Sequence, residues 1–578
     1  LLFLFVFTYS SCVMRIAYCV IYLQYIVDAV QCAIYDIRNT QYEIREMEDY
    51  RQVILSAKPG QIVPIVKEID IDEPVDFFAR LSDYGRAKNC ALFEASDYLA
   101  ENALSFGTAK PALYLTGTGV EFTIKALSNT GRRIIEYLAN TQRFDFCERV
   151  EFGPETITGQ IKRDEKIVDE QTRLQSTNQM DVLRAVAFAF SLASSPFRVT
   201  CGLLGAISYD FIDQFEKLPA NKEDLLGNPD YELYFADNIF LCDHQRNKGY
   251  CIVNCLITDG DREALITEAQ DCFDYYFHVA QSRGKIAPAG QRYTGLLTET
   301  STDTNQDEYE QMVRDAKQHI IDGDIFQVVL SRTILEPCPD EPLDVYKRLR
   351  ALNPSPYMFY LNTPNTILMG SSPELNLRVS GTAKRSVEIR PIAGTKPRGR
   401  VGNTIDADTD FRYEAELKLD HKELAEHMML VDLARNDIAR VAEPGSRIVT
   451  ELLTVEKYAA VQHLVSNVKG TLATGLDALN AYLATMNMGT LTGAPKIEAM
   501  KLIRLFEKTK RGYYGGAVMY LTVDGQFDSC ITIRSLQVKD HTAYIRVGAG
   551  IVHDSVPKTE FEETEHKANS CLRAIRGK

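Results

Sequence analysis

The order of the strands and helices predicted for the second half of this 578-residue chain constrains its fold more than any other feature. Short β-branched and aromatic segments, such as 358–361, 367–369 and 543–547, follow one another there with few helices between them. Parallel neighbours in a sheet need a crossover of a dozen or more residues, usually a helix, whereas antiparallel neighbours need only a turn. We therefore predict an α+β fold with antiparallel sheets rather than a doubly wound parallel sheet.

The composition divides the chain into four parts. Residues 281–304 are polar and rich in Gly, Ser and Thr, which is typical of a connector, here between an N-terminal domain at 47–280 and a second domain at 305–578. Residues 1–46 form an apolar N-terminal extension whose uncharged runs are shorter than the roughly 20 residues that a membrane helix needs. We expect this extension to be non-native, with the true start near Met47; a membrane anchor or a signal is the alternative.

Helical patterns in the second domain begin with a segment that Thr304 or Asn305 can cap and that Gly323 ends. Further helices are predicted at Tyr413–Arg440 and Lys558–Arg576. A strand is predicted over Cys530–Val538, and it contains Arg534 among Ile and Leu residues. An Arg in such a strand either forms an ion pair on an outer face or binds a carboxylate.

Charge and cysteine content exclude some classes of function. The formal net charge of −15 disfavours nucleic-acid binding, which depends on Lys and Arg against phosphate. The 13 cysteines contain no CxxC pair, so we expect reduced thiols in a cytoplasmic protein for which a membrane role is unlikely. The motifs of zinc proteases, P-loops, dinucleotide-binding folds and serine hydrolases do not occur in the sequence.

Two pairs of glutamates fall on the predicted helices, and within each pair the residues are three positions apart and so share one face. These pairs are Glu423 with Glu426, and Glu560 with Glu563. One carboxylate from each of two helices suits a hard cation such as Mg²⁺. The spacing alone leaves open the commoner alternative, a solvated helix surface.

Two glycine-containing segments could receive an anion. Gly394 and Thr395 lie in the basic segment RPIAGTKPRGR at 390–400, where backbone N–H groups and a hydroxyl can donate hydrogen bonds. Gly548 and Gly550 permit close approach of a ligand to the backbone. A solvated loop and a tight turn are the alternatives for these two segments.

Several segments match, in order, the motifs of one family. They are IFQVVLSR at 325–332, NPSPYMF at 353–359, SPE at 372–374, PIAGT at 391–395, DHKELAEH at 420–427, LVDLARND at 430–437, MGTLTGAPK at 488–496 and GAG at 548–550. From about residue 89 onward the chain resembles anthranilate synthase component I, a family of chorismate-utilising enzymes. The resemblance implies a two-domain, sheet-rich fold with the helices outside, regulatory elements in 47–280, and chorismate bound in a deep cleft of 305–578.

The same resemblance assigns roles to individual residues. It implies a Mg²⁺ ion held by Glu426 and Glu563, with Glu423 and Glu560 close by. The implied catalytic residues are Glu374, His463, Gln327 and Thr490. The implied substrate contacts are Gly394, Thr395, Tyr514, Arg534, Gly548, Ala549, Gly550 and Lys567. Glu374 would act as general acid on the departing C4 hydroxyl, and His463 is associated with the elimination of pyruvate.

The implied reaction is that of a lyase that aminates chorismate at C2, loses the C4 hydroxyl and eliminates pyruvate to give anthranilate, the first step of tryptophan biosynthesis. Gln327 stands where the water-using relatives have a Lys base, and Ala393 stands where aminodeoxychorismate synthases have a Lys nucleophile. The alternatives are aminodeoxychorismate synthase and a synthase that releases 2-amino-2-deoxyisochorismate. A non-catalytic relative would lack the metal carboxylates, whereas all four are present here.

The resemblance also implies partners. Ammonia would come from a separate glutamine amidotransferase subunit, component II, in a heterotetramer, because the chain has no GxCxG-type nucleophile motif. Tryptophan is the expected feedback inhibitor. The residues that match its site are Glu94, Ala95, Ser96, Pro356, Tyr357, Met358, Val518 and Tyr520. The family motif LLES reads LFEA here, with Ala95 in the place of Ser.

Overall fold

The computed structural model describes residues 47–577 except 96–102, 163–173, 193–196, 259, 283–296, 403 and 459–460. Its described strands form two large antiparallel sheets and one short hairpin, β20 (Arg400–Val401) with β21 (Thr404–Ile405). Within the large sheets every described pair is antiparallel except β1 with β8. The predicted α+β fold with antiparallel sheets is therefore confirmed.

The first sheet runs, in spatial order, through β13 (Ser301–Thr302), β14 (Gln327–Pro337), β28 (Thr542–Ile551), β27 (Ser535–Lys539), β16 (Ile367–Ser372), β15 (Tyr357–Asn362), β2 (Cys90–Glu94), β3 (Leu104–Thr108), β11 (Asn238–Asp243), β12 (Lys248–Leu256), β1 (Gln61–Ile69) and β8 (Ser191–Leu192), with β24 (Gly493–Ala494) beside β14. The second runs through β19 (Ile392–Pro397), β23 (Val461–Thr471), β18 (Ser386–Ile389), β17 (Leu375–Ser380), β26 (Phe527–Ile531), β25 (Ala517–Thr522), β9 (Gly202–Ile207), β10 (Tyr231–Ala236), β4 (Leu113–Thr118), β5 (Glu121–Ala126), β7 (Thr156–Ile161) and β6 (Cys147–Phe152), with β22 (Ile448–Lys457) beside β23.

Each sheet takes strands from both halves of the sequence. In the first sheet β15 pairs with β2, so that Met358 lies opposite Glu94. In the second sheet β25 pairs with β9, so that Val518 lies opposite Ala206. The connector at 281–304 is therefore not a boundary between sheets, and the division of the chain into two domains stays a prediction.

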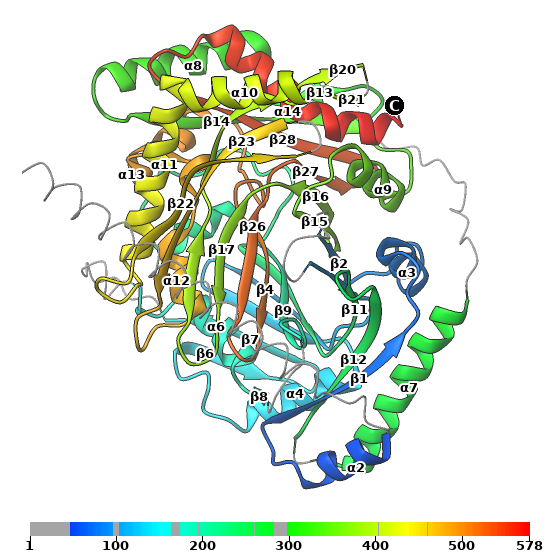
Figure 1. Cartoon of the computed structure of the whole chain (residues 1–578). Coiled ribbons are helices and arrows are strands. Elements are labelled where there is room, and N and C mark those ends of the chain that lie inside the picture. Colours follow the sequence, from blue (N-terminus) through cyan, green and yellow to red (C-terminus); the bar gives the residue numbers. More distant parts are fainter. Residues whose placement is uncertain are drawn as a thin grey trace, which may run out of the picture.

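The helices are α2 (Met47–Ser56), α3 (Pro74–Leu81), α4 (Asn129–Ala139), α6 (Met180–Ala187), α7 (Arg262–Gln281), α8 (Gln306–Ile321), α9 (Pro342–Leu352), α10 (Ala407–Leu419), α11 (His421–Ala439), α12 (Ala478–Thr485), α13 (Lys496–Phe506) and α14 (Pro557–Arg576), with short 3₁₀ helices η1 (Tyr209–Gln214) and η2 (Gly489–Leu491). Helix α7 covers β12, and α14 crosses β28 beside α8 and α9 (Figure 1). Of the two predicted caps, Thr304 and Asn305, it is Asn305 that caps α8, in a full capping box with Glu308.

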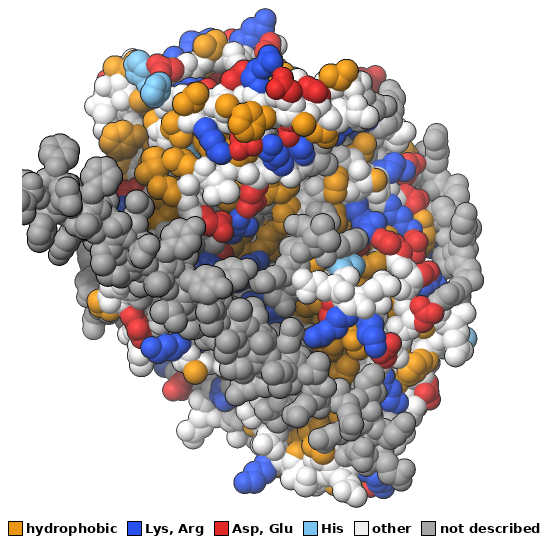
Figure 2. Space-filling model, viewed as in Figure 1, with side chains coloured by type: hydrophobic (Ala, Val, Ile, Leu, Met, Phe, Trp, Pro, Cys, Tyr) orange, Lys and Arg blue, Asp and Glu red, His pale blue; other side chains and the backbone are white. Residues whose placement is uncertain are grey.

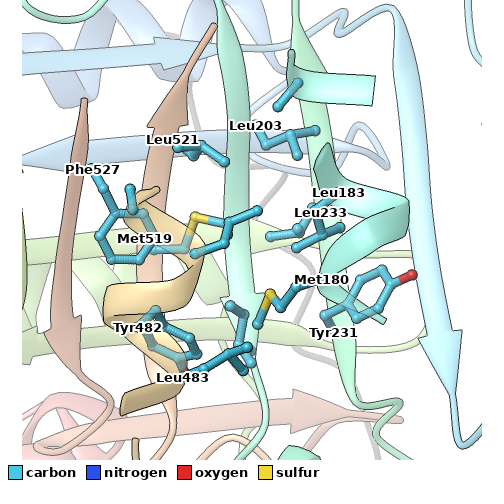
Figure 3. Close-up of a cluster of buried hydrophobic side chains, with 14 of the residues drawn as sticks. Met180, Leu183, Leu203, Tyr231, Leu233, Tyr482, Leu483, Met519, Leu521 and Phe527 are labelled. Carbon is cyan, nitrogen blue, oxygen red and sulfur yellow. The ribbon is translucent and has the colours of Figure 1, made fainter. Parts of the chain in front are cut away.

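The core is layered because successive side chains of a strand point to opposite faces. On β15, Phe359 and Leu361 face a cluster between the two sheets, whereas Met358 and Tyr360 face the helices that cover the first sheet. On the outer face of the second sheet, Met519 and Leu521 of β25 pack near Met180 and Leu183 of α6 and Tyr482 and Leu483 of α12 (Figure 3). The sheets thus face each other with helices outside, which confirms that part of the prediction.

Two predicted elements are each split in the structure. The helix predicted at Tyr413–Arg440 is two helices, because Asp420 ends α10 and caps α11 by accepting the backbone N–H groups of Lys422 and Glu423. The prediction of one strand over Cys530–Val538 is wrong, because this segment contains two strands, β26 and β27, that lie in different sheets. Arg534 joins them in a left-handed conformation, with φ of 50°.

The described residues contain no helix that is both long and apolar enough to cross a membrane. The predicted extension 1–46 lies outside the described residues. All ten cysteines in the described ranges are free thiols and nine of them are buried, as expected from their spacing.

Candidate active site

The predicted metal carboxylates face one another from α11 and α14. Burial raises the pKa of Glu426, and the carboxylate of Glu563 on the other helix raises it further. Burial also raises the pKa of Glu423, with Glu426 adding to it, and that of Glu560, with Glu563 adding to it. The structure therefore brings the two predicted pairs together, at a cost in repulsion that a cation would relieve.

This donor set fits a hard divalent cation only in part. In the ranges that the structure describes, no three His, Cys, Asp or Glu side chains form a complete metal site. Lys567 pairs with Glu563 at 2.6 Å, and its Nζ also donates to the Gly548 carbonyl at 2.9 Å. A bound Mg²⁺ would therefore take carboxylates from two helices and complete its shell with water or ligand oxygens, which is its usual habit.

Glycines leave space beside these carboxylates. A Cβ atom on Gly550 would lie 2.8 Å from Gln327 Nε2 and 3.9 Å from Glu426 Oε1, and one on Gly394 would lie 3.1 Å from Glu423 Oε2. Gln327 Nε2 donates to Glu426 Oε1 at 3.1 Å, which ties β14 to α11. The lack of a side chain at Gly394 and Gly550 thus keeps open the space next to the carboxylates.

Glu374 is the most perturbed acid of the predicted site. It lies between β16 and β17, it is 5% exposed, and burial raises its pKa to about 8, although the positive charge of Lys567 acts to lower it. The side chain is therefore protonated at neutral pH and can donate a proton. Glu374 Oε1, Thr490 Oγ1 and Gln327 Oε1 are all buried without a hydrogen-bond partner. Buried polar atoms of this kind are rare in native proteins and are consistent with a site that a ligand or water completes.

His463 is held against the segment that contains Gly394. In the register of β19 and β23, Thr395 lies opposite His463. Thr395 Oγ1 and His463 Nδ1 are 2.9 Å apart, and Nδ1 lies 3.2 Å from the Gly394 carbonyl oxygen. Burial lowers the pKa of His463, so the imidazole is neutral near pH 7 and can accept or donate a proton.

Arg534 supplies a cation at the same place. Burial lowers its pKa, and the neighbours that act on it include Tyr514 and Glu563. Of the ion pairs between described residues, none involves the Arg534 guanidinium. Because a partly buried guanidinium is normally paired with an anion, Arg534 is suited to bind a ligand carboxylate. The sequence predicted that Arg534 lies within a strand. In the structure it lies instead in the left-handed link between the two sheets.

Comparison with known proteins identifies the family. The model of the chorismate binding enzyme family matches residues 137–573. Anthranilate synthase component 1 of Vibrio cholerae is 41% identical over 495 residues, which cover 84% of this chain and 91% of that protein. The Escherichia coli protein of the same name is 38% identical over 513 residues, or 87% of this chain and 95% of that protein. This chain belongs to the anthranilate synthase component 1 family of chorismate-binding enzymes.

Solved structures agree with this assignment. Anthranilate synthase component I from Streptococcus pneumoniae superposes with a TM-score of 0.65 at 29% identity, covering 82% of this chain and 93% of that one. The menaquinone-specific isochorismate synthase of Escherichia coli has a TM-score of 0.58 at 16% identity, covering 92% and 98%, and so shares the fold. The sheet-rich α+β fold predicted from the family resemblance is thereby confirmed.

A cavity of about 690 Å³ lies between the two sheets. It is lined by seven of the eight residues predicted for tryptophan: Glu94, Ala95, Pro356, Tyr357, Met358, Val518 and Tyr520. Ser96 lies outside the described residues. A recess lined by hydrophobic side chains is visible near the middle of the face in Figure 2. The structure therefore brings the predicted regulatory residues together, and it separates them from the carboxylates of α11 and α14.

The sequence analysis did not predict that Arg378, Asp528 and Tyr458 line the cavity between the sheets. Arg378 Nε donates to Asp528 Oδ2 at 2.7 Å, and the Tyr357 hydroxyl donates to Asp528 Oδ1 at 3.0 Å. Tyr458 lines the cavity too, and its ring lies 5.6 Å from that of His463. Arg378 and Asp528 are the only charged residues of β17 and β26, and that was the available signal. Their pairing depends on the register of β17 and β26, which the sequence does not encode locally.

Proposed function

We propose that this enzyme is the large subunit of anthranilate synthase and converts chorismate and ammonia to anthranilate and pyruvate. The observation that carries the proposal is the buried Glu374, whose pKa is raised to about 8, in a site that also has Arg534, a cation without a carboxylate partner among the described residues. Chorismate is a dianion that must lose its C4 hydroxyl, so it requires a proton donor and cationic partners. The names of the most similar relatives support the same reaction.

In this proposal the site residues divide into those that bind the substrate and those that transfer protons. Arg534 binds one substrate carboxylate, while Gly394, Thr395, Tyr514, Gly548, Ala549, Gly550 and Lys567 line the remaining substrate surface. Glu374 gives its proton to the C4 oxygen as the bond to carbon breaks, a contribution typically worth about 10²–10⁴-fold in rate. His463 takes part in the later proton transfer by which pyruvate leaves and the ring becomes aromatic.

We propose magnesium as the cofactor, held by Glu426 and Glu563 with Glu423 and Glu560 beside it. When bound, the ion would neutralise a substrate carboxylate that the four glutamates otherwise repel. Lys567 already offsets part of this repulsion through Glu563. Gln327, a neutral amide donor to Glu426, cannot activate water as a Lys base would, which favours ammonia as the nucleophile.

Two related reactions remain as alternatives. A synthase that releases 2-amino-2-deoxyisochorismate would stop before pyruvate leaves, and the contacts of His463 with Thr395 and Gly394 favour the complete reaction. Aminodeoxychorismate synthase chemistry needs a nucleophilic Lys where this chain has Ala393. A purely regulatory role is disfavoured by the four intact carboxylates.

We further propose that ammonia is supplied by a glutamine amidotransferase subunit in a heterotetramer, as the designation component 1 of the relatives suggests. Tryptophan is the proposed occupant of the cavity between the sheets, where it would act as feedback inhibitor. A cytoplasmic location is part of the same proposal.

The test uses the purified full chain with chorismate, Mg²⁺ and an ammonium salt at mildly alkaline pH. Anthranilate is followed by fluorescence, and the product is identified by mass. We expect metal-dependent anthranilate that is lost in Glu426→Ala. An aminated product that still carries pyruvate would indicate the intermediate-releasing synthase, and an inhibition curve that stays flat to millimolar tryptophan would remove the regulatory proposal.

A further inference from the structure

A buried charged network lies beneath the strands that carry the candidate active site. Glu507, Arg511 and Arg546 are 4%, 4% and 7% exposed. Glu507 accepts from Arg511 Nε at 3.0 Å and from Arg546 Nη2 at 2.7 Å. Burial alone would raise the pKa of Glu507, but the two guanidinium groups outweigh it and lower the pKa. The network is therefore one carboxylate and two cations, all ionised.

Arg511 joins three segments that carry site residues. Its Nη1 donates to the Leu491 carbonyl at 2.7 Å, directly after Thr490 in η2. Its Nη2 donates to the Val329 carbonyl at 2.7 Å, two residues after Gln327 in β14. Its guanidinium also lies 5.8 Å from the ring centroid of Tyr514. Four of the five N–H donors of this guanidinium are thus used, two on backbone carbonyls and two on Glu507.

Arg546 and Ser331 extend the network to the backbone of Gly548. Arg546 Nε donates to Ser331 Oγ at 2.8 Å, and the Ser331 backbone N–H and hydroxyl each donate to Glu507 Oε1 at 2.8 Å. Ser331 is the register partner of Gly548 across β14 and β28. A Cβ atom on Gly548 would lie only 3.1 Å from the Tyr514 hydroxyl. The network therefore fixes how closely Gly548 approaches Tyr514.

A neighbouring buried arginine shows what a purely structural ion pair looks like in this protein. Arg504, 6% exposed, lies one α13 turn before Glu507 and pairs with Asp210 and Asp213, each at 2.9 Å. Neither of these aspartates belongs to the candidate site. Arg511 is equally buried, yet its acceptors lie in segments that carry Thr490 and Gln327. The two arginines are similar in burial and charge. Their acceptors differ, because those of Arg504 lie in η1, where Asp210 also accepts the Gly512 backbone N–H at 2.8 Å.

We propose that Arg511, together with Glu507 and Arg546, is a positioning residue that holds Thr490, Tyr514 and Gly548 in the geometry the reaction requires. This inference rests on the proposed function. The network touches no substrate itself, and it acts by fixing backbone that would otherwise be free to shift. Misplacement of reacting groups by about 1 Å can cost on the order of 100-fold in rate.

Arg511→Lys tests this role, because Lys keeps the charge but has three donors and no planar fork. We expect kcat with chorismate and saturating ammonium to fall about 10- to 100-fold, while the KM for chorismate changes far less. Arg504→Lys is the matched control, with a comparable loss of Tm and a kcat close to wild type. Each variant is assayed well below its own Tm.

Ser331→Ala provides a second test should Arg511→Lys fold poorly. It removes only the hydroxyl between Glu507 and Arg546, keeps every charge, and is expected to lower kcat about three- to ten-fold, the worth of a typical hydrogen bond. Equal kcat losses in Arg511→Lys and Arg504→Lys, or wild-type kcat in both Arg511→Lys and Ser331→Ala, would overturn the positioning role. A wild-type chain without ammonium-dependent turnover would instead refute the proposed function.

Discussion

Tyr458 packs edge-on against His463, with the two ring centroids 5.6 Å apart, while its hydroxyl donates to Glu456 at 2.8 Å. The same Tyr458 lines the cavity that contains Tyr357 and Met358. One side chain therefore lies at both the candidate catalytic histidine and the candidate regulatory cavity.

This contact predicts different results for two substitutions of Tyr458. Tyr458→Leu removes the ring that supports the imidazole, and we expect kcat to fall about ten-fold through looser placement of His463. Tyr458→Phe keeps the ring and loses only the hydrogen bond to Glu456, so it serves as the control with kcat near wild type. Steady-state kinetics with ammonium measures both. Equal loss in the two variants would show that the hydroxyl, and not the ring, matters.

The raised pKa of Glu374 predicts how stability depends on pH. The folded protein keeps this proton up to pH of about 8, whereas an unfolded chain releases it near the ordinary value of 4.5. Stability is therefore lost as pH rises from 4.5 through about 8. Glu374→Gln, which stays neutral, should match wild type in Tm near pH 4.5 and exceed it at pH 8 and above. Parallel Tm-against-pH curves for the two proteins would show that Glu374 titrates normally.

The sequence predicted much of the local structure and little of the long-range pairing. The helix start at Thr304 or Asn305 and the helical spacing of Glu560 and Glu563 could be predicted because they depend on neighbours within one turn. The break between α10 and α11 also had a local signal. Asp420 with Glu423 three residues later is a typical helix start, and it was overlooked inside a long helical pattern.

The position of Arg534 could not be predicted from local sequence. The segment from Cys530 to Val538 reads as one strand, yet it leaves the second sheet and enters the first through a left-handed residue. Which distant strands pair with one another is decided by tertiary packing, so the Arg378–Asp528 pair was equally hidden. Family motifs predicted the individual site residues, whereas only the structure relates Tyr458 to His463.

Gly550 tests the space beside the carboxylates. In Gly550→Ala the new methyl group would lie 2.8 Å from Gln327 Nε2 and 3.9 Å from Glu426 Oε1. We expect the KM for chorismate to rise about ten-fold or more, since the methyl group occupies volume that ligand would fill, while Tm falls by only a few degrees. Gly260→Ala is the control, because its Cβ would have no atom closer than 3.7 Å. An unchanged KM would place the substrate elsewhere.

Ala95 can be used to test whether tryptophan binds in the cavity between the sheets. This alanine lines the cavity at the position where the family motif has Ser. Ala95→Ser adds a hydroxyl that can hydrogen-bond to a polar ligand, an interaction worth about 0.5–1.5 kcal/mol. The concentration of tryptophan for half-maximal inhibition should therefore fall about two- to ten-fold, without a change in kcat. Ala103→Ser, at the other alanine that lines the cavity, is the matched control and should leave inhibition unchanged. If both serines act alike, or neither acts, Ala95 does not contact the inhibitor.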